Sequence, residues 1–250
     1  MRVGVLADIH GNLPALEAVL EDLVSRGIDD LVILGDLVAK GPFPREVLDR
    51  VKGLRAVVIR GNGDEQFGLG VPIWQDPERP RARDSVALYR WVSERLSEED
   101  IAYLIRLPFS HSIFAGERRA LCVHACPDNT TDLIFPFATD RELAERFFKE
   151  ELVTSPTEGG LAAVLYAHIH RPFVRYVAGK PLINVGSVGQ PFDGDPRACY
   201  AILAFKDDDF SIALNRVPYD VEATVRQAIR GGMPAAETYA RMIRTASWPY

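Results

Sequence analysis

The sequence predicts an α/β fold in which two sheets pack face to face with helices on the outside. In the first 62 residues, short apolar runs alternate with segments of helical periodicity, which indicates a parallel sheet with right-handed crossovers. From Ser110 onward, strand-like segments dominate, which indicates a second sheet. A chain of 250 residues is long enough to bury a substantial core between such sheets.

The N-terminal elements each carry a local signal. Arg2–Ala7 is a short apolar run suited to a buried strand, and residues 13–26 have the periodicity of an amphipathic helix. Asn12 and Pro14 stand where a helix begins, and Gly27 stands where one ends. The expected order continues with a strand over Asp30–Leu34, a helix over Pro44–Val51 and a strand over Ala56–Arg60.

Residues 67–107 differ from this alternating part. Prolines at positions 72, 77 and 80 predict a loop, and Ser97 with Asp100 resembles a helix cap and its partner. The two expected helices cover Asp84–Leu96 and Ser97–Arg106. Because this segment is too small for a core of its own, we interpret it as a helical insertion in a single domain that spans residues 1–250.

The second half of the sequence is rich in strands. The expected strands cover Ser110–Ala115, Arg119–His124, Ala162–Ala167, Phe173–Ala178, Pro181–Val185, Cys199–Phe205 and Asp209–Arg216. One helix is expected over Asp140–Glu150, and two more, Val221–Arg230 and Pro234–Ile243, end the chain within residues 221–243.

Composition restricts the class of protein. Hydrophobic residues make up 47% and charged residues 26%, and no stretch approaches the roughly 18 apolar residues of a membrane span. The first residues lack the features of a signal peptide, so we expect a cytoplasmic protein. The net charge of −6 argues against stable binding to nucleic acid. Cys122, Cys126 and Cys199 are an odd set, so we expect reduced, partly buried thiols.

Metal-binding side chains follow the apolar runs of the sequence. They are Asp8, His10, Asp36, Asn62, His124, His168 and His170. Because ligand sites form at the carboxyl ends of strands in open α/β sheets, we expect these side chains to meet in space. Carboxylates mixed with imidazoles suit borderline transition metals better than magnesium. Asp36 could bridge two ions about 3.5–4 Å apart, as in two-metal phosphatases.

Five sequence blocks resemble those of the calcineurin-like metallophosphoesterase superfamily, and most of all its small bacterial and archaeal phosphodiesterase branch. The blocks are Asp8-Ile-His10, Gly35-Asp36, Gly61-Asn62-Gly63-Asp64, Val123-His124 and His168-Ile169-His170, with an Asn184–Pro191 stretch that also fits the branch. The resemblance implies a four-layer α/β/β/α sandwich. It assigns Asp8, His10, Asp36 and His170 to one metal, and Asp36, Asn62, His124 and His168 to the other. It also implies in-line attack by a metal-bound hydroxide, with Asn62 helping to stabilise the phosphoryl oxygens.

Two positions depart from the superfamily pattern. The third block usually has His where this chain has Gly63, so no side chain at that position assists the leaving oxygen. We therefore expect an aryl phosphodiester to be a better substrate than the matching monoester, and Gly63→His to narrow the gap unless Gly63 has a positive φ. The fifth block usually begins with Gly, and the Ala167 found here is a mild change.

Other polar residues receive weaker assignments. His111 matches no block, and we expect it to be structural or on the surface. Asn184 and Ser187 fit a turn as well as a site-lining role. The roles of Asp64, Arg171, Asp193 and Arg197 stay open, with solvated loop charges as the simplest account of the last three.

These observations favour a dinuclear metal-dependent hydrolase that acts on a small phosphate ester, most of all a diester. The alternatives are a hydrolase of dinucleoside polyphosphates or other phosphoanhydrides, and a non-catalytic scaffold of the same fold. Manganese is the first choice of ion, and Fe, Ni, Co and Zn are the others. We expect a small phosphorylated substrate, with nucleotide-like compounds among the candidates, and no membrane partner. The sequence leaves a homo-oligomer open.

Overall fold

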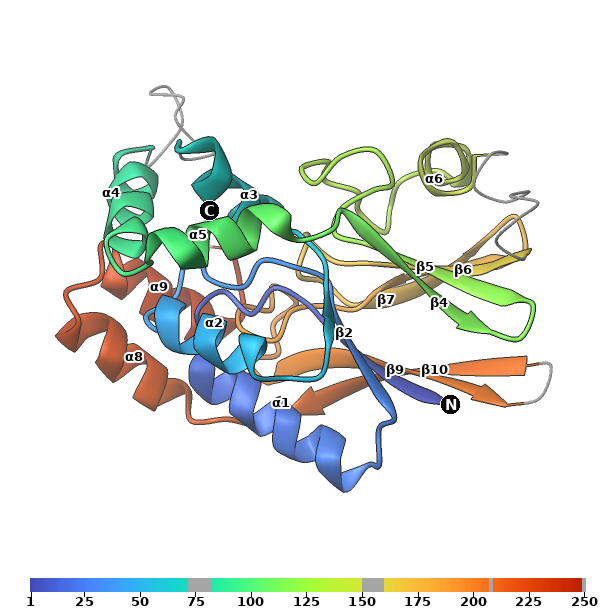
Figure 1. Ribbon diagram of the computed structural model, residues 1–250, viewed down its shortest axis with the longest axis horizontal. Helices are drawn as coiled ribbons and strands as arrows, with labels where there is room; N and C mark the ends of the chain where they lie inside the picture. Colours follow the sequence, from blue (N-terminus) through green and yellow to red (C-terminus); the bar gives the residue numbers. More distant parts are fainter. Residues whose placement is uncertain (72–81, 150–159, 207–208, 249–250) are drawn as a thin grey trace.

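Two mixed five-stranded sheets form the centre of the computed structural model, which describes residues 1–71, 82–149, 160–206 and 209–248 (Figure 1). The first sheet has the order β10-β9-β1-β2-β3, and the second has the order β4-β5-β6-β8-β7. In the first, β1, β2 and β3 are parallel, and β9 and β10 run antiparallel. In the second, β5, β6 and β8 are parallel, and the two edge strands are antiparallel to their neighbours.

The strands have the following bounds. Those of the first sheet are β1 (Arg2–Leu6), β2 (Asp30–Ile33), β3 (Val57–Val58), β9 (Ala198–Lys206) and β10 (Asp209–Val217). Those of the second are β4 (Ser110–Ala115), β5 (Arg118–Val123), β6 (Gly160–Tyr166), β7 (Phe173–Val177) and β8 (Lys180–Asn184).

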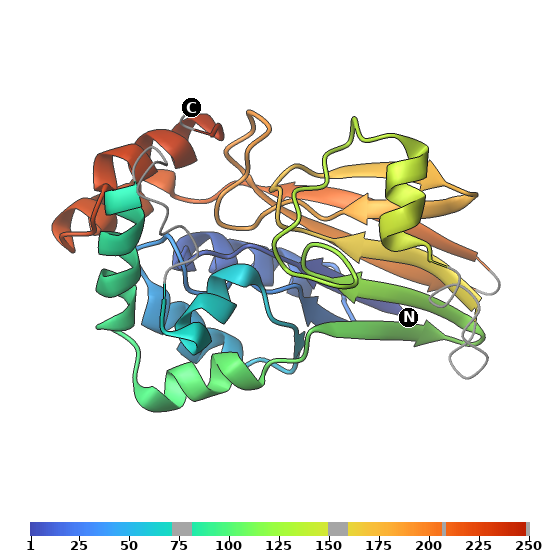
Figure 2. The ribbon, with the colours of Figure 1, turned by 90° about the horizontal axis from the view of Figure 1, so that it is seen from above.

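Helices lie on both outer sides of the sheet pair (Figures 1 and 2). They are α1 (Leu13–Ser25), α2 (Pro44–Lys52), α3 (Asn62–Leu69), α4 (Ala82–Ser93), α5 (Glu98–Arg106), α6 (Asp140–Phe147), α8 (Val221–Arg230) and α9 (Ala236–Thr245). Helix α1 contacts β9, β10 and α8, whereas α6 contacts β7 of the other sheet. The expected α/β/β/α sandwich is therefore confirmed.

Three apolar clusters fill the interfaces between these layers. The alternation of side chains along a strand sends successive residues to different clusters. In β6, Ala163 and Leu165 face the other sheet, whereas Val164 and Tyr166 pack under α6. Phe67, Trp91 and Leu104 of the expected insertion join the same cluster as the side chains of α1 and α2. The helices α3, α4 and α5 thus share the core on the outer side of the first sheet.

The expected elements agree with the structure to within three residues at each end, but one strand is shorter than expected and one helix was not expected. The strand expected over Ala56–Arg60 is only two residues long. Helix α3 was not expected, because its segment contains Gly63 and Gly68 and has no clear apolar periodicity. It forms because Asp64 accepts from the N–H of Gly61 at the helix start and Phe67 enters the core. The expected proline loop and the end of the expected Asp140–Glu150 helix lie outside the described residues.

Other expectations concern the thiols and the membrane. Cys122, Cys126 and Cys199 are all free, as expected, and are more fully buried than the sequence indicated. Within the described ranges, no helix combines the length and apolar character needed to cross a membrane.

Candidate metal centre

The seven residues singled out in the sequence meet at one edge of the sheet pair. Asp8 and His10 follow β1, Asp36 follows β2, and Asn62 begins α3 directly after β3. His124 follows β5 of the second sheet, and His168 and His170 follow β6. All these positions are at carboxyl ends of parallel strands, where the argument from topology places a ligand site.

Two clusters of donor atoms lie within this site. Asp8, His10 and His170 bring one ligand atom each to within 4.8 Å of the others, and Asp36, His124 and His168 do the same. Asp36 connects the clusters, because its Oδ2 lies 3.5 Å from Nε2 of His10 and its Oδ1 lies 3.7 Å from Nε2 of His124. The arrangement could hold two ions with one shared carboxylate.

Backbone carbonyls fix the tautomers of three imidazoles. Nδ1 of His10 lies 3.0 Å from the carbonyl oxygen of Ala39. The matching distance is 2.7 Å from Nδ1 of His124 to Leu34, and 2.6 Å from Nδ1 of His170 to Gln190. Because a carbonyl only accepts, each Nδ1 must donate, and each neutral ring then presents the lone pair of Nε2. Such carbonyl contacts are the usual support of histidine ligands in metal sites.

The donor atoms of the first cluster are arranged in a way that suits a cation. Nε2 of His10 lies 3.1 Å from Nε2 of His170, so two lone pairs face each other. Asp8 Oδ1 is fully buried, lies 3.5 Å from Nε2 of His170, and has no hydrogen-bond partner. A carboxylate oxygen and two imidazole nitrogens that converge in this way are the donor set of a borderline transition metal.

Asn62 belongs to the second cluster. Its Oδ1 lies 2.9 Å from Nε2 of His124, another approach of two lone pairs. The opposite amide orientation would let Nδ2 donate to Nε2 of His124 at 2.9 Å and to Nδ1 of His168 at 2.8 Å. Nε2 of His168 already contacts the carbonyl of Thr131 at 3.2 Å, which leaves Nδ1 as its free nitrogen. With a cation among these three residues, the oxygen-inward orientation is the favourable one.

Strained backbone marks the same residues. Asp8, His10, Asp36, His168 and His170 all have left-handed φ values, between 48° and 68°. Such values cost energy in non-glycine residues and cluster at functional sites. Gly35 is left-handed too, with a φ of 85°, and a Cβ there would collide with the backbone of Gly61. This close approach brings the ends of β2 and β3 together.

Asp64, whose role the sequence left open, holds Asp36 in place. Its carboxylate accepts from the N–H groups of Asp36 at 2.8 Å, Leu37 at 2.9 Å and Gly61 at 3.1 Å. Burial, followed by the charge of Asp36, raises the pKa of Asp64 to about 7. Asp64 of the third block thus holds the backbone around Asp36 of the second block in position.

The Asn184–Pro191 stretch contacts the backbone that carries the candidate ligands. Ser187 Oγ donates to the carbonyl of Asp8 at 2.7 Å, and Nδ2 of Asn184 donates to the carbonyl of Ala167 at 2.6 Å. Both side chains are fully buried. These contacts favour a structural role for Asn184 and Ser187 over a role in lining the site.

Burial keeps two imidazoles in the form that binds metals. Burial, with Lys40 and His170 adding to it, holds the pKa of His10 well below its usual value. Burial, followed by His124, lowers the pKa of His168 to about 3. Burial opposes the charged form of His124 as well, but Asp36 and Asp8 raise its pKa. Metal binding therefore displaces no proton from His10 or His168 near neutral pH.

The structure separates the remaining polar candidates from this centre. His111 is half-buried on β4 and lines a different cavity, with Met1 and Phe114. Asp193 pairs with Arg216 on β10, and Arg197 pairs with Asp195 at 2.6 Å, so these charges form ion pairs away from the metal centre. Arg171 is exposed beside His170.

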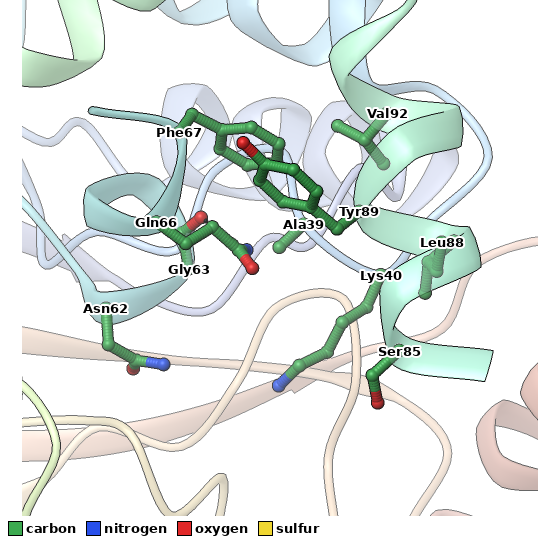
Figure 3. A pocket seen from close by; sticks show the side chains of 10 residues that line it. All are labelled: Ala39, Lys40, Asn62, Gly63, Gln66, Phe67, Ser85, Leu88, Tyr89 and Val92. Atoms are coloured by element: carbon green, nitrogen blue, oxygen red, sulfur yellow. Dashed lines mark hydrogen bonds between the residues drawn. The ribbon is translucent and has the colours of Figure 1, made fainter. Parts of the chain in front are cut away.

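A basic residue that sequence reasoning missed lies in the site. Nζ of Lys40 is 3.5 Å from Nε2 of His10, and Lys40 lines a cavity together with Asn62 and Gly63 (Figure 3). The sequence could have indicated Lys40, because it is four residues after Asp36, in the loop that follows the second block.

Comparison with known proteins agrees with this geometry. The profile of the calcineurin-like phosphoesterase superfamily domain matches residues 1–208. The chain belongs to this superfamily. The crystal structure of a metallophosphoesterase from Sphaerobacter thermophilus is 30% identical, with a TM-score of 0.71 over 98% of this chain and 99% of that one.

Other proteins are similar to this chain over most of its length or over part of it. Protein PH1004 of Pyrococcus horikoshii is 26% identical in sequence, and its structure has a TM-score of 0.77 over 97% of each chain. The uncharacterised protein MJ0912 of Methanocaldococcus jannaschii is 29% identical over 93% of both chains. Phosphodiesterase YfcE of Escherichia coli is 37% identical over 91 residues, which cover 30% of this chain and 50% of that protein.

Proposed function

We propose that this phosphoesterase-superfamily protein hydrolyses a phosphodiester with two divalent transition ions, manganese first among them. One ion is held by Asp8, His10, Asp36 and His170, and the other by Asp36, Asn62, His124 and His168. The observation that carries this proposal is the position of Asp36, whose two oxygens face the two clusters at 3.5 and 3.7 Å. Ions held there would supply Lewis acidity and a coordinated water of lowered pKa.

The chain's own residues would bind and orient the substrate. Asn62 turns its oxygen toward His124, which leaves its amide nitrogen on the side of the cavity where Lys40 lies (Figure 3). From there the amide would donate to a phosphoryl oxygen. The N–H groups of Asp36 and Leu37 donate to the carboxylate of Asp64, and Asp36 fixed in this way would keep the two halves of the site in register. Fixed donors of this kind favour the transition state because they need no reorganisation.

A diester is the preferred class because no side chain at position 63 can protonate a leaving oxygen. A positioned general acid typically contributes about 10²–10⁴-fold in rate. A substrate with an aryl leaving group needs little of this help, and a diester carries less negative charge than a monoester. We expect kcat/KM for an aryl phosphodiester to exceed that for the matching aryl monoester.

Manganese-loaded protein assayed with bis(p-nitrophenyl) phosphate and with p-nitrophenyl phosphate tests this prediction. A preference for the monoester would exclude the diesterase assignment and leave a dinuclear hydrolase. A third assay with a dinucleoside polyphosphate separates hydrolysis of an anhydride from that of an ester. If all three substrates are inert while two manganese ions are bound, that result contradicts the proposed hydrolysis of a simple diester and favours the non-catalytic scaffold.

A further inference from the structure

Three aromatic rings form a series of contacts that leads away from the candidate metal centre. The ring of Phe192 stacks on His170, with ring centroids 4.5 Å apart and an interplanar angle of 8°. Trp248 meets Phe192 at nearly a right angle, at a centroid distance of 4.9 Å. His170 and Phe192 are buried, whereas Trp248 is 48% exposed. The indole is therefore the exposed end of a series that begins at a proposed metal ligand.

Trp248 belongs to a C-terminal segment, residues 218–248, that lies outside the range matched by the superfamily profile. The profile matches residues 1–208, and helices α8 and α9 come after this range. Both helices pack into the core on the outer side of the first sheet, where Val225, Tyr239 and Ile243 join the same cluster as the side chains of α1. The C-terminal segment is thus part of the same folded unit as the metal centre.

Local backbone geometry brings the end of the C-terminal segment to the site. Helix α9 ends at Thr245, and Ala246 has a left-handed φ of 46°, which costs energy in a residue other than glycine. The carbonyl of Ala246 accepts from the N–H of Gly194 at 2.9 Å. Because Gly194 is two residues after Phe192, this bond holds the segment against the loop between β8 and β9, which lies beside the end of α9 in Figure 2.

The beginning of the C-terminal segment contacts the loop that carries His10. The hydroxyl of Tyr219 accepts from Nδ2 of Asn12 at 3.1 Å, and Oγ1 of Thr224 donates to Oδ1 of Asn12 at 3.1 Å. Asn12 follows His10 by two positions. The segment is thus attached near both histidines of the first cluster, which fixes the place of its indole relative to that cluster.

An exposed indole near a polar centre suits the recognition of a flat aromatic group. Tryptophan is a large, rigid ring that proteins usually bury, so an indole that is nearly half exposed offers apolar area to a ligand. Its π face can stack on any nucleobase, because every base has a π face as well. A nucleotide carries its base one sugar away from its phosphate. A phosphate at the metal centre would therefore bring the base close to an indole that is two ring contacts from His170.

We propose that Trp248 is a substrate-contacting residue that stacks on a planar aromatic substituent of the phosphate ester, a nucleobase above all. This inference rests on the function proposed above, and it deepens it by naming the part of the substrate that is recognised away from the phosphorus. Substrate preference would then come from the C-terminal segment, and the metal chemistry from residues that the superfamily profile covers.

A binding experiment tests the role of Trp248 without catalysis. Adenosine 5′-monophosphate and ribose 5-phosphate share the sugar and the phosphate and differ in the base, and each is titrated into manganese-loaded protein by calorimetry. The wild type should bind the nucleotide more tightly. Trp248→Leu, which keeps apolar bulk without a ring, should lose about 5- to 100-fold of this advantage, as expected for the loss of one base–aromatic stack. Trp248→Phe, which keeps a ring, should retain most of it.

The matched control is Tyr176→Leu, which changes a 68% exposed aromatic residue on β7 and should leave both affinities at the wild-type values. Metal content and melting temperature are measured for each variant. Equal affinity of the wild type for adenosine monophosphate and ribose phosphate would overturn the inference. So would an affinity ratio that Trp248→Leu leaves unchanged. A loss of bound manganese in both Trp248 variants would overturn it as well, since the indole would then act by positioning His170.

Kinetics separates a failure of this inference from a failure of the proposed function. Two diesters with the same p-nitrophenyl leaving group are compared, one with thymidine attached through its 5′ oxygen and one with a methyl group. The ratio of kcat/KM for the thymidine ester to that for the methyl ester should fall in Trp248→Leu and stay near wild type in Trp248→Phe. A wild type that takes up no manganese and hydrolyses neither ester contradicts the proposed function. A wild type that hydrolyses both, with the ratio unchanged in Trp248→Leu, contradicts only the role of Trp248.

Discussion

Asp36 presents one oxygen to each half of the proposed centre, which makes it the residue whose change should matter most. Asp36→Asn removes the negative charge that both ions would share while it keeps the size of the side chain. We expect kcat/KM to fall by about 10³-fold or more, which corresponds to about 4 kcal/mol of transition-state stabilisation. His111→Ala, at a half-buried position on β4, is the control. Equal losses in the two variants would show that Asp36 is not the bridge.

Asp64 acts on the chemistry only through Asp36. Three backbone N–H groups donate to the carboxylate of Asp64 in the wild type. In Asp64→Asn the amide N–H₂ would face some of these N–H groups, and two donors cannot form a hydrogen bond. Changing such a supporting partner typically costs about 10- to 100-fold in metal affinity or activity. Manganese titration should show this loss, and Asp49→Asn on the exposed side of α2 should show none. An unchanged manganese affinity would mean that the loop around Asp36 holds its shape without the carboxylate.

The space around Gly63 could not be predicted from the sequence. A positive φ was the expected obstacle to a side chain there, but the residue is helical, in the first turn of α3. The obstacle is contact: a Cβ at this position would lie 2.8 Å from Oδ1 of Asp36 and 3.1 Å from Cβ of Ala39. The N–H of Gly63 also donates to that oxygen at 2.5 Å. Gly63→His must therefore shift Asp36, so it is a poor way to restore an imidazole.

At the scale of elements, Asp100 connects two helices outside the site. It caps α5 together with Ser97, as the sequence indicated, and Oδ1 accepts from Nζ of Lys52 on α2 at 2.6 Å. Although burial opposes this, Lys52 and Ser97 lower the pKa of Asp100 from 3.8 to about 2. The two helices are thus joined by a carboxylate that stays charged in the folded protein down to low pH.

The sign of this shift gives a test in acid. A carboxylate with a lower pKa in the folded state stabilises the fold fully above about pH 4, and the contribution disappears as the pH falls toward 2. At pH 7 Asp100→Asn should lower the free energy of unfolding by about 2 kcal/mol, and the difference from wild type should shrink below pH 3. Urea unfolding at both pH values measures it. A difference that does not depend on pH would assign the loss to the helix cap alone.

Elements with strong periodicity or clear caps were predictable, and the others were not. Helix α1 begins after Asn12, whose side chain accepts from the N–H of Ala15, and α8 has the expected bounds. Helix α3 was missed because its stability comes from Asp64 and from the packing of Phe67, which are tertiary contacts. Lys40 was missed for the same reason, since only the fold brings it to His10. The candidate ligands were found because each follows a strand.

At the scale of the whole molecule, bound metal should stabilise the fold. An ion that binds only the folded chain adds about 2.7 kcal/mol to the free energy of unfolding at a concentration a hundredfold above its Kd. In a protein of this size, that gain raises Tm by about 5–10 °C. Calorimetry of chelator-treated and manganese-loaded protein, with elemental analysis for two ions per chain, measures this. A protein that stays metal-free in excess manganese, with an unchanged Tm, would contradict the dinuclear proposal.

The order of strands in the first sheet has a consequence for synthesis on the ribosome. β1 lies between β2 and β9, so a strand near the N-terminus pairs with one that is translated after residue 197. Asp8 and His10 leave the ribosome early, but His170 is 160 positions from His10, and β9 follows later still. Because domains generally fold as units, a nascent chain cannot assemble this site in stages. We therefore expect metal uptake after β9 has inserted beside β1, since a chain truncated before Ala198 would carry every candidate ligand and still lack β9 and β10, the strands that flank β1 on one side of the first sheet.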